Sequence, residues 1–311
     1  MALVRSEERG PRAPLLSSNR WYRLVRHLTG YIFLAPMIVI LGLFVVFPIV
    51  YVLYLSLFRV DLLAGTWTFA GLDNYRYLLE DMKVRYALRN TITYAAVVVP
   101  TQTVIALLLA AILNTGIRGR EFFRVAYFVP TVTSSAVLTL IFMWMYSKTG
   151  LLNAILNRLG LPGYDWLNDP RIALVSIMIM NIWSTVGQYM VIYLAALQDI
   201  PRTLYEAARV DGASWWQQLR YVTLPMLKPA TNFVVIMGII GTLQLFDQAF
   251  IFSDGSGGPN NATLTMVLYI YQNAFRNFDF GYAGALSFVL AVVIMIGTVL
   301  YRALAGEGRY R

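Results

Sequence analysis

Six long apolar runs, separated by polar segments, dominate the pattern of the chain. They cover residues 31–58, 90–113, 125–146, 172–197, 230–252 and 283–301, and the only charged residue within them is Asp247. Each run reaches or approaches the ~20 residues that an α-helix needs to cross the hydrocarbon core of a bilayer. The pattern therefore predicts six transmembrane helices.

Composition supports a membrane protein. The chain has 311 residues, 58% of them hydrophobic, and its mean hydropathy is +0.60, which is too apolar for a soluble domain. The first run is longer than the apolar core of a signal peptide, and no small-x-small cleavage site follows it, so we expect a retained span. The predicted fold is an all-α membrane protein with a basic cytoplasmic tail at residues 1–30, a six-helix domain at 31–302 and a cytoplasmic tail at 303–311.

The net charge of +9 does not indicate a nucleic-acid partner once the charges are placed on six spans. If the N-terminus is cytoplasmic, 16 of the 25 Lys and Arg residues fall in cytoplasmic segments, before residue 27 and at 118–124, 202–228 and 302–311. Such an excess is the positive-inside pattern of membrane proteins. We therefore expect a multi-pass protein with both termini in the cytoplasm and with membrane lipid, not nucleic acid, as a partner.

Residues that would support catalysis or metal binding are missing from the sequence. It has no cysteine, and its single histidine, His27, lies in the basic tail without a second ligand of that type. No G-x-x-x-x-G-K-[ST] phosphate loop, His-Glu-x-x-His motif or G-x-S-x-G motif is present. The carboxylate pair Glu80-Asp81 lies near Lys83 and Arg85 and is expected to be solvated charge. We therefore predict that the chain is not an enzyme and that it binds neither a metal nor a cofactor.

The polar segment at residues 199–228 carries the most specific motif of the chain. It has the form E-A-A, three residues, Gly, nine residues, an apolar residue, one residue and Leu-Pro, at Glu206, Ala207, Ala208, Gly212, Val222, Leu224 and Pro225. Thr203–Glu206 and Ser214–Gln217 have the spacing of capping boxes, which begin helices. Gly212 lies between them, where a helix can end in a left-handed residue. Two short helices that meet at Gly212 are predicted, and an ordinary amphipathic loop helix is the alternative.

This spacing resembles the cytoplasmic EAA loop of permease subunits of bacterial ATP-binding-cassette (ABC) importers. Other short motifs are similar to those of carbohydrate permeases of the maltose and glycerol-phosphate type, and they occur in the same order. They are Phe122-Phe-Arg124, Val129-Pro130, Trp166-Leu-x-Asp-Pro170, Ala196-Leu-Gln-x-Ile-Pro201 and Gly257-Gly-Pro259. The resemblance covers residues 31–302 and implies the type I ABC importer permease fold.

The resemblance also implies partners in the bacterial cytoplasmic membrane. These are a second permease subunit, two ATPase subunits that bind ATP and Mg²⁺, and an extracytoplasmic sugar-binding protein. In this family the EAA loop inserts into a cleft on an ATPase subunit and transmits its closure. The expected ATPase-coupling residues are therefore Glu206, Ala207, Ala208, Asp211, Gly212, Leu224 and Pro225.

Polar side chains inside the runs predict the path of the solute, because they are costly in hydrocarbon and tend to face a water-filled interior. The fourth run has a stripe at helical spacing, formed by Asn181, Ser184, Thr185 and Gln188, and the fifth run has Gln244, Asp247 and Gln248 at i, i+3 and i+4. The third run offers Thr131, Thr133, Ser134 and Ser135. Hydrogen bonds between spans, or to a partner permease, are the alternative role for all of them.

In maltose-type permeases the positions that contact the solute lie on the same three spans. The resemblance places them here at Thr131, Ser135, Ser184, Thr185, Gln188, Gly241, Gln244, Leu245 and Gln248.

The charges within the runs favour a neutral solute. A phosphorylated or carboxylated solute would need a fixed cation or a helix N-terminus on its path, and no run contains Lys or Arg. We therefore favour a neutral mono- or oligosaccharide over glycerol phosphate, and a cationic amino sugar is a further alternative because of Asp247. A stand-alone secondary transporter is the alternative from another class. It would often show inverted repeats and broken spans with ion ligands, and neither is evident in the sequence.

Overall fold

The structure is a computed structural model that describes the backbone of residues 20–61 and 65–306 and the side chains of residues 31–60 and 65–306. Much of the predicted N-terminal tail, residues 1–19, and residues 307–311 of the C-terminal tail lie outside the described residues. Six helical segments in the described part are long and apolar enough to cross a membrane, at Tyr31–Leu55, Met82–Asn114, Ser135–Arg158, Ala173–Gln198, Lys228–Phe252 and Phe280–Ala305. The predicted number of spans is therefore confirmed.

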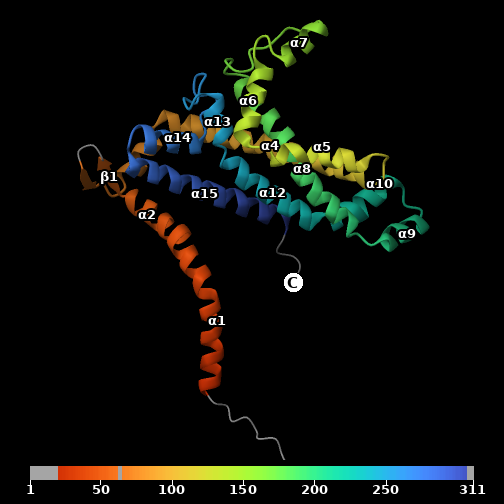
Figure 1. The fold of residues 1–311 in the computed structure, drawn as a ribbon, viewed down its shortest axis with the longest axis horizontal. Coiled ribbons are helices and arrows are strands. Elements are labelled where there is room, and N and C mark those ends of the chain that lie inside the picture. Colours follow the sequence, from red (N-terminus) through yellow and green to blue (C-terminus); the bar gives the residue numbers. More distant parts are fainter. Residues whose placement is uncertain (1–19, 62–64, 307–311) are drawn as a thin grey trace, which may run out of the picture. The chain divides into compact units, whose positions relative to one another are not determined.

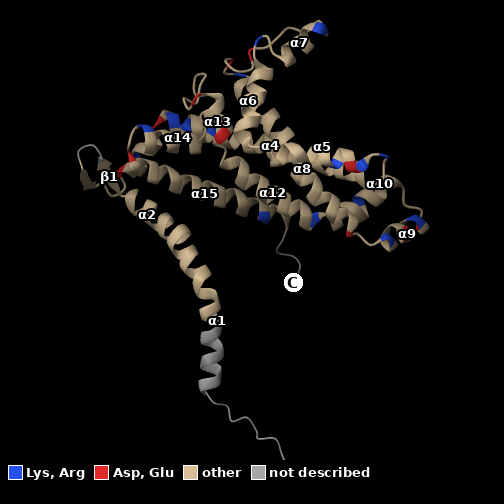
Figure 2. Ribbon diagram, viewed as in Figure 1, with Lys and Arg blue, Asp and Glu red and all other residues tan. Residues whose placement is uncertain are grey.

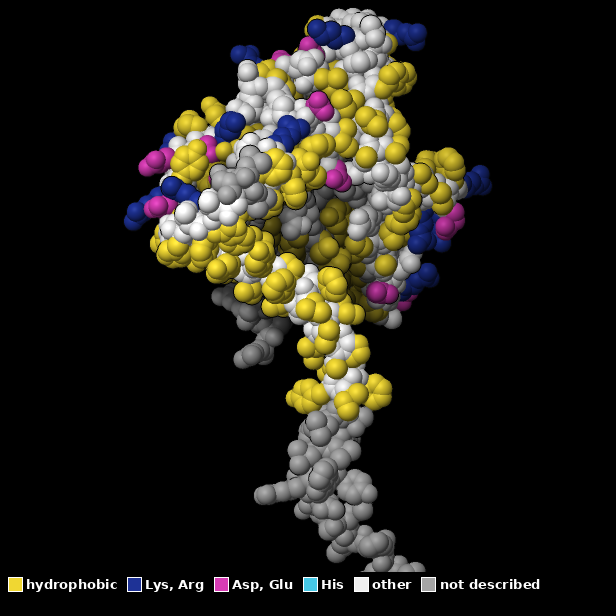
Figure 3. All heavy atoms as spheres, turned by 60° about the vertical axis from the view of Figure 1, so that its left-hand side comes forward, with side chains coloured by type: hydrophobic (Ala, Val, Ile, Leu, Met, Phe, Trp, Pro, Cys, Tyr) yellow, Lys and Arg dark blue, Asp and Glu magenta, His cyan; other side chains and the backbone are white. Residues whose placement is uncertain are grey.

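The described residues divide into two units, one that ends at Tyr51 and one that begins at Val52. In the first unit, α1 (Arg20–Leu41) begins inside the predicted N-terminal tail and continues into the first span. A π-helical turn, Gly42–Val46, separates it from α2 (Phe47–Leu55). Pro48 has no N–H with which to continue the regular hydrogen bonding, which accounts for the irregular turn before it. All residues of 31–51 except Gly42 are exposed, and apolar side chains cover this segment in Figure 3.

The second unit is built around two long helices, α4 (Met82–Asn114) and α8 (Ala173–Gln198), which pack along each other (Figure 1). On α4, the fully buried Ala106 and Ala110 lie in one cluster with Met190 and Tyr193 of α8. The small alanines let the two helices approach closely. α12 (Lys228–Leu243) packs on α4, and α15 (Phe280–Ala305) packs on α12. In Figure 2, the charged residues of this unit lie mainly in loops and near helix ends, and the middle parts of α4, α8, α12 and α15 carry none.

The predicted third span, 125–146, is not one helix. It is divided into α5 (Arg120–Val132) and α6 (Ser135–Tyr146), because Thr133 and Ser134 have extended backbone angles. The Thr131 hydroxyl donates to the Phe128 carbonyl over 2.7 Å, and the Thr133 hydroxyl donates to the Val129 carbonyl over 3.0 Å. Such side-chain bonds compete with helical hydrogen bonds and favour a break. The span instead continues from α6 into α7 (Leu151–Arg158).

The fifth span is also broken. α12 ends at Leu243 and α13 (Asp247–Phe252) begins three residues after Gln244, the C-terminal cap of α12. The Thr242 hydroxyl donates to the Gly238 carbonyl over 2.7 Å, and the Leu245 carbonyl accepts from the Thr265 hydroxyl over 2.8 Å. A neighbouring segment therefore satisfies a backbone carbonyl at the break. The expectation that the spans are unbroken is wrong at this position and at Thr133–Ser134.

A small β-hairpin is the one departure from the all-α prediction within the described residues. β1 (Phe58–Asp61) and β2 (Thr66–Phe69) pair antiparallel, with Phe58 opposite Phe69. The strands are too short to give a clear alternating pattern in the sequence. The hairpin lies against the start of α15, where Gly281 leaves no room for a side chain beside the Phe58 carbonyl.

Asp81 joins three helices near this hairpin. It is the N-cap of α4, and its Oδ1 accepts from the Lys83 backbone N–H over 2.8 Å. Its Oδ2 accepts from Tyr282 of α15 over 2.8 Å and from Tyr269 of α14 (Met266–Tyr271). Burial, together with the bond to Asp81, raises the pKa of Tyr269, so its hydroxyl keeps the proton that it donates. The expectation that Asp81 is solvated charge is therefore wrong.

Candidate functional site

A polar cavity of about 150 Å³ lies where the break between α5 and α6 faces α8 and α13. The cavity is lined by neutral side chains only, eight of them polar. The lining residues are Pro130, Thr131, Thr133, Ser135, Leu138, Met180, Asn181, Ser184, Thr185, Gln188 and Gln248. The eight polar side chains are all among those that the sequence analysis places on the solute path, and the fold brings them together here.

The stripe on α8 faces the cavity because of its helical spacing and because α5 lies very close. Asn181, Ser184, Thr185 and Gln188 follow i, i+3, i+4 and i+7 and so share one side of the helix. Gly187 lies next to this stripe, and a Cβ at this position would overlap the carbonyl of Tyr127 in α5. A glycine at position 187 thus allows α5 to approach α8.

Hydrogen bonds fix part of the cavity wall. The Ser184 hydroxyl donates to the Asn181 carbonyl over 2.9 Å, and the Thr185 hydroxyl lies 2.8 Å from the same carbonyl. Ser135 Oγ is buried at the start of α6 and has no hydrogen-bond partner among the described residues. Ser135 therefore carries an unsatisfied polar atom inside the wall, covered from solvent in the single chain.

Three predicted pathway residues are not part of this wall. Ser134, Gln244 and Asp247 are exposed and do not line the cavity. The predicted i, i+3, i+4 spacing of Gln244 and Asp247 with Gln248 assumed a continuous helix, and the break between α12 and α13 removes it. Of the two further positions carried over from the family, Gly241 is exposed and Leu245 is buried, and neither lines the cavity.

The EAA loop, residues 199–228, lies at the end of the second unit away from β1 and forms two helices as predicted (Figure 1). α9 (Arg202–Val210) has Asp211 as its C-cap, and Gly212, whose φ is +74°, comes next. α10 (Trp215–Gln218) begins three residues later. The Gly212 N–H donates to the Arg209 carbonyl and the Ala213 N–H donates to the Ala208 carbonyl, the pattern of a Schellman motif. The left-handed glycine between two helices is therefore confirmed.

One of the two predicted capping boxes is formed. Gln217 N–H donates to Ser214 Oγ over 3.4 Å, and Ser214 N–H donates to Gln217 Oε1 over 2.6 Å. The box predicted at Thr203–Glu206 is wrong, because Pro201 is the N-cap of α9 and Thr203 lies inside its first turn. After α10, a π-helical turn (Leu219–Thr223) and α11 (Leu224–Met226) lead back to α12.

The EAA loop exposes large apolar side chains that sequence reasoning did not single out. Val210 is 88% exposed, Trp215 63%, Trp216 71% and Tyr221 71%. Exposed apolar groups that cluster in this way mark surfaces for contact with other molecules. The paired tryptophans within a polar loop were the signal in the sequence.

The predicted coupling residues share this exposed surface. Exposed positions are Glu206, Ala207, Asp211, Gly212, Leu224 and Pro225, while Ala208 is half-buried. On the inner side of the loop, the hydroxyls of Tyr205 and Thr223 lie 2.9 Å apart and tie α9 to the returning chain.

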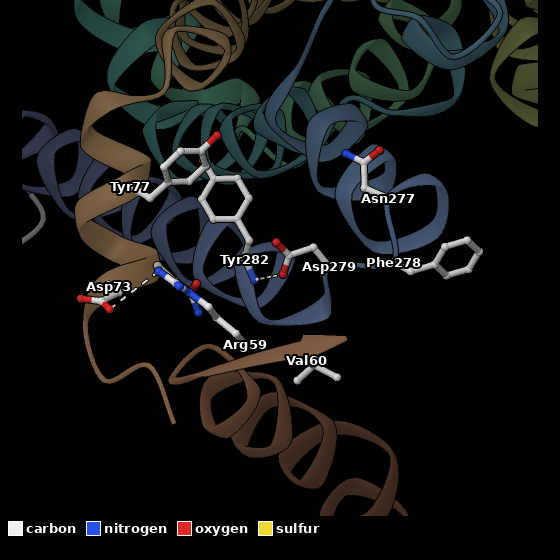
Figure 4. Close-up of a pocket in the computed structure, with 9 residues that line it drawn as sticks. Arg59, Val60, Asp73, Tyr77, Asn277, Phe278, Asp279 and Tyr282 are labelled. Carbon is white, nitrogen blue, oxygen red and sulfur yellow. Dashed lines mark hydrogen bonds and ion pairs between the residues drawn. The ribbon is translucent and has the colours of Figure 1, made fainter. Parts of the chain in front are cut away.

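A larger cavity, of about 560 Å³, opens at the opposite end of the unit, between β1, α3 (Asp73–Glu80) and the start of α15 (Figure 4). Its charged groups are engaged within the fold. Arg59 pairs with Asp73 over 3.8 Å, and Asp279 Oδ1 accepts from the Tyr282 N–H over 3.0 Å. Among the described residues, no group of three or more His, Cys, Asp or Glu side chains could hold a metal ion.

Comparison with known proteins gives a consistent result. Residues 102–307 match the family described as binding-protein-dependent transport system inner membrane component. The chain is 40% identical to the lactose transport system permease protein LacF of Rhizobium radiobacter, over 90% of this chain and 93% of that protein. It is 32% identical to the trehalose/maltose transport system permease protein MalF of Thermococcus litoralis, over 95% of this chain and 98% of that protein.

Solved structures agree with the fold. A chain from the crystal structure of a bacterial ABC transporter involved in the import of the acidic polysaccharide alginate matches with a TM-score of 0.80. The match has 22% sequence identity and covers 94% of this chain and 99% of that chain. The predicted importer-permease fold is therefore confirmed.

Proposed function

The chain belongs to the family of binding-protein-dependent transport system inner membrane components, and we propose that it is the permease subunit of an ATP-driven importer whose solute is a neutral sugar. A permease subunit is not itself an enzyme, so ATP hydrolysis belongs to separate subunits. Relatives named for transport of lactose, of arabinooligosaccharides and of trehalose and maltose support a carbohydrate as the solute.

The observation that carries the proposal is the chemistry of the polar cavity. Its wall has eight polar side chains and no ionisable one. Hydroxyl and amide groups match the hydroxyls of a neutral sugar, which both donate and accept. The alternative role of these side chains, packing between helices, is weakened by the open volume between them.

The size of the cavity supports a site shared with a second permease subunit. Its volume of about 150 Å³ is half of the ~300 Å³ at the lower end of small-molecule sites. A second, related permease would supply the missing wall. The exposed Gln244 and Asp247, next to cavity residue Gln248, are then candidates to face the solute beyond this chain's own cavity.

The exposed surface of the EAA loop supports docking of an ATPase subunit. We propose that Glu206, Asp211 and Leu224, together with the exposed tryptophans of α10, contact the cleft of that subunit. ATP and Mg²⁺ would bind to the two ATPase subunits, and an extracytoplasmic binding protein would deliver the sugar at the opposite end. A related-fold transporter has been solved in complex with a periplasmic protein that carries an alginate pentasaccharide.

The proposed function implies an orientation. We propose that both termini and the EAA loop are cytoplasmic, in the bacterial cytoplasmic membrane. The excess of Lys and Arg in the segments that a six-span topology places on the same side as the EAA loop supports this orientation.

Two other solutes fit the cavity less well. Glycerol phosphate has one observation in its favour, the N-terminus of α6 at the cavity, but no cation lines the wall to complete an anion site. The case for a cationic amino sugar as the solute depended on the charge of Asp247, and Asp247 does not line the cavity. The stand-alone secondary transporter is excluded by the family, although the broken spans expected of such carriers are present.

The test is transport by the complete importer in proteoliposomes, with its cognate binding protein and ATP. We expect uptake and stimulated ATP hydrolysis with a neutral sugar, lactose being the first to try, and neither with glycerol 3-phosphate or glucosamine. Omission of the binding protein or of ATP is the control. Uptake of only the phosphorylated or the cationic compound would overturn the proposal.

A further inference from the structure

Gln102 lies directly behind the polar cavity. Its side chain on α4 is 1% exposed and does not line the cavity. Its Oε1 lies 2.9 Å from Oγ1 of Thr185, which does line it. Its Nε2 is buried and has no hydrogen-bond partner among the described residues. A buried amide thus contacts a cavity residue from behind while half of its hydrogen-bonding capacity is unused.

Gly238 of α12 makes the room for this amide. A Cβ at position 238 would lie 2.8 Å from Gln102 Nε2 and 3.4 Å from the Val99 side chain. The first distance is shorter than a real carbon atom tolerates, so any larger residue would push the amide away. The amide is therefore enclosed between α12 on one side and Thr185 of α8 on the other.

The hydroxyl of Thr185 lies within hydrogen-bond distance of two acceptors but can donate to only one of them at a time. It lies 2.9 Å from Gln102 Oε1 and 2.8 Å from the Asn181 carbonyl, yet it has one proton to donate. A half-turn of the amide exchanges Nε2 and Oε1 with little change of shape. Nε2 then donates to Thr185, and Thr185 donates to Asn181 as threonines in helices commonly do. The amide oxygen is left without a donor, but an unpaired buried oxygen is tolerated better than an unpaired N–H.

We propose that Gln102 is a positioning residue that sets the polarity of the cavity at Thr185. By donating through Nε2, it fixes the Thr185 proton on the Asn181 carbonyl and leaves one lone pair of Oγ1 available to the cavity. Thr185 then accepts a hydrogen bond from a sugar hydroxyl and does not donate one. This inference rests on the proposed function, and it adds a specificity-determining residue that does not touch the solute.

The first test is a double-mutant cycle on the complete permease–ATPase complex in detergent, without the binding protein. The measured quantity is the dissociation constant, by calorimetry, of lactose or of the neutral sugar taken up fastest in the transport panel. We expect Gln102→Leu to raise it about three- to tenfold, the effect of one neutral hydrogen bond. In the Thr185→Val background, Gln102→Leu should have no further effect, because the hydroxyl that it positions is gone.

The cycle separates this inference from the proposed function. If Thr185→Val raises the dissociation constant but Gln102→Leu does not, the cavity stands and the positioning role is overturned. An equal effect of Gln102→Leu in both backgrounds would also overturn it, since Gln102 would then act through packing. If Thr185→Val itself changes nothing, the cavity assignment fails, and this inference fails with it. Gln102→Met is the second variant if Gln102→Leu does not assemble.

Gly238 provides an independent arm of the test. Gly238→Ala should displace the amide and weaken sugar binding as Gln102→Leu does. In the Gln102→Ala background the added methyl has room, so Gly238→Ala should then have no further effect. Gly297→Ala is the matched control, because a Cβ there would meet Ile239 at an ordinary 3.6 Å. If Gly238→Ala still weakens sugar binding in the Gln102→Ala background, Gly238 acts through helix packing. That outcome would overturn its part in the inference.

Discussion

Gly187 of α8 lies directly against the main-chain carbonyl of Tyr127 in α5, and a Cβ at position 187 would overlap that oxygen. This contact lies beside the polar cavity. Gln188 follows Gly187 on α8, and Thr131 lies one turn after Tyr127 on α5, and both line the cavity.

Gly187→Ala should therefore push α5 away from α8. Overpacking of a close contact costs about 1–3 kcal/mol, and backbone yields less readily than a flexible side chain. We expect a lower thermal unfolding temperature of the purified complex and a loss of most sugar uptake. Gly297→Ala in α15, where a Cβ makes ordinary contacts, is the control. Unchanged unfolding and uptake in Gly187→Ala would show that α5 can move without consequence.

The polar stripe of α8 was predictable from the sequence, whereas the polar positions of the fifth span were only partly predictable. Asn181, Ser184, Thr185 and Gln188 lie on an unbroken helix, so their spacing alone placed them on one face. The spacing of Gln244 and Asp247 misled, because a tertiary hydrogen bond to Thr265 stabilises a break that periodicity does not reveal.

The same distinction applies to other parts of the fold. The helix end at Gly212 and the capping box at Ser214 depend on residues close in sequence, and both were predicted. The carboxylate of Asp81 looked solvated because its partners, Tyr269 and Tyr282, are far away along the chain. Gln102 was missed for the same reason, since only the packing of α4 on α8 brings it to Thr185.

Gly212→Val should weaken the link between ATP hydrolysis and transport. Gly212 has a φ of +74°, and a Cβ at this position would meet no atom within 4 Å, so the cost of a substitution is in the backbone alone. The left-handed conformation costs a residue with a Cβ about 1–2 kcal/mol, and a β-branched residue is especially unsuited to it. We expect reduced uptake per ATP hydrolysed in reconstituted complexes.

The control for this variant is Gly212→Asn, since asparagine tolerates the left-handed region better than other residues with a side chain. It should retain more coupling than Gly212→Val. Normal uptake and normal ATPase stimulation in Gly212→Val would reject the requirement for a left-handed residue between α9 and α10.

Gln188→Leu and Thr185→Val should lower transport without preventing assembly. Each removes polar groups from the wall of the polar cavity while keeping the approximate size of the side chain. Loss of one neutral hydrogen bond is worth about 0.5–1.5 kcal/mol, a factor of about 2–10 in apparent affinity. Uptake kinetics and the yield of intact complex are the measurements. Thr298→Val is the control, because Thr298 bonds to Ile294 within its own helix and does not line the cavity.

The proposed orientation can be tested with single cysteines, because the sequence contains none. Leu159→Cys, at a position 69% exposed after α7, should react with a membrane-impermeant maleimide added to intact spheroplasts. Arg118→Cys, at an exposed position between α4 and α5, should react only after permeabilisation. Labelling in the reverse order would place the EAA loop outside and contradict the proposed orientation.

Asp247→Asn should alter transport while leaving assembly intact. Asp247 is the only charged residue in the apolar runs, and the structure places it on the first turn of α13, exposed in the single chain and next to cavity residue Gln248. We propose that it faces the part of the pathway shared with the second permease, where water reaches it. Asparagine keeps the shape and much of the hydrogen bonding, so a change in uptake rate or solute preference is expected with a normal yield of complex. If Asp247 instead forms a buried ion pair with the partner, its removal would strand a cation at a cost of about 3–5 kcal/mol. The yield of intact complex on size-exclusion chromatography decides between the two roles, because only the ion pair predicts its loss.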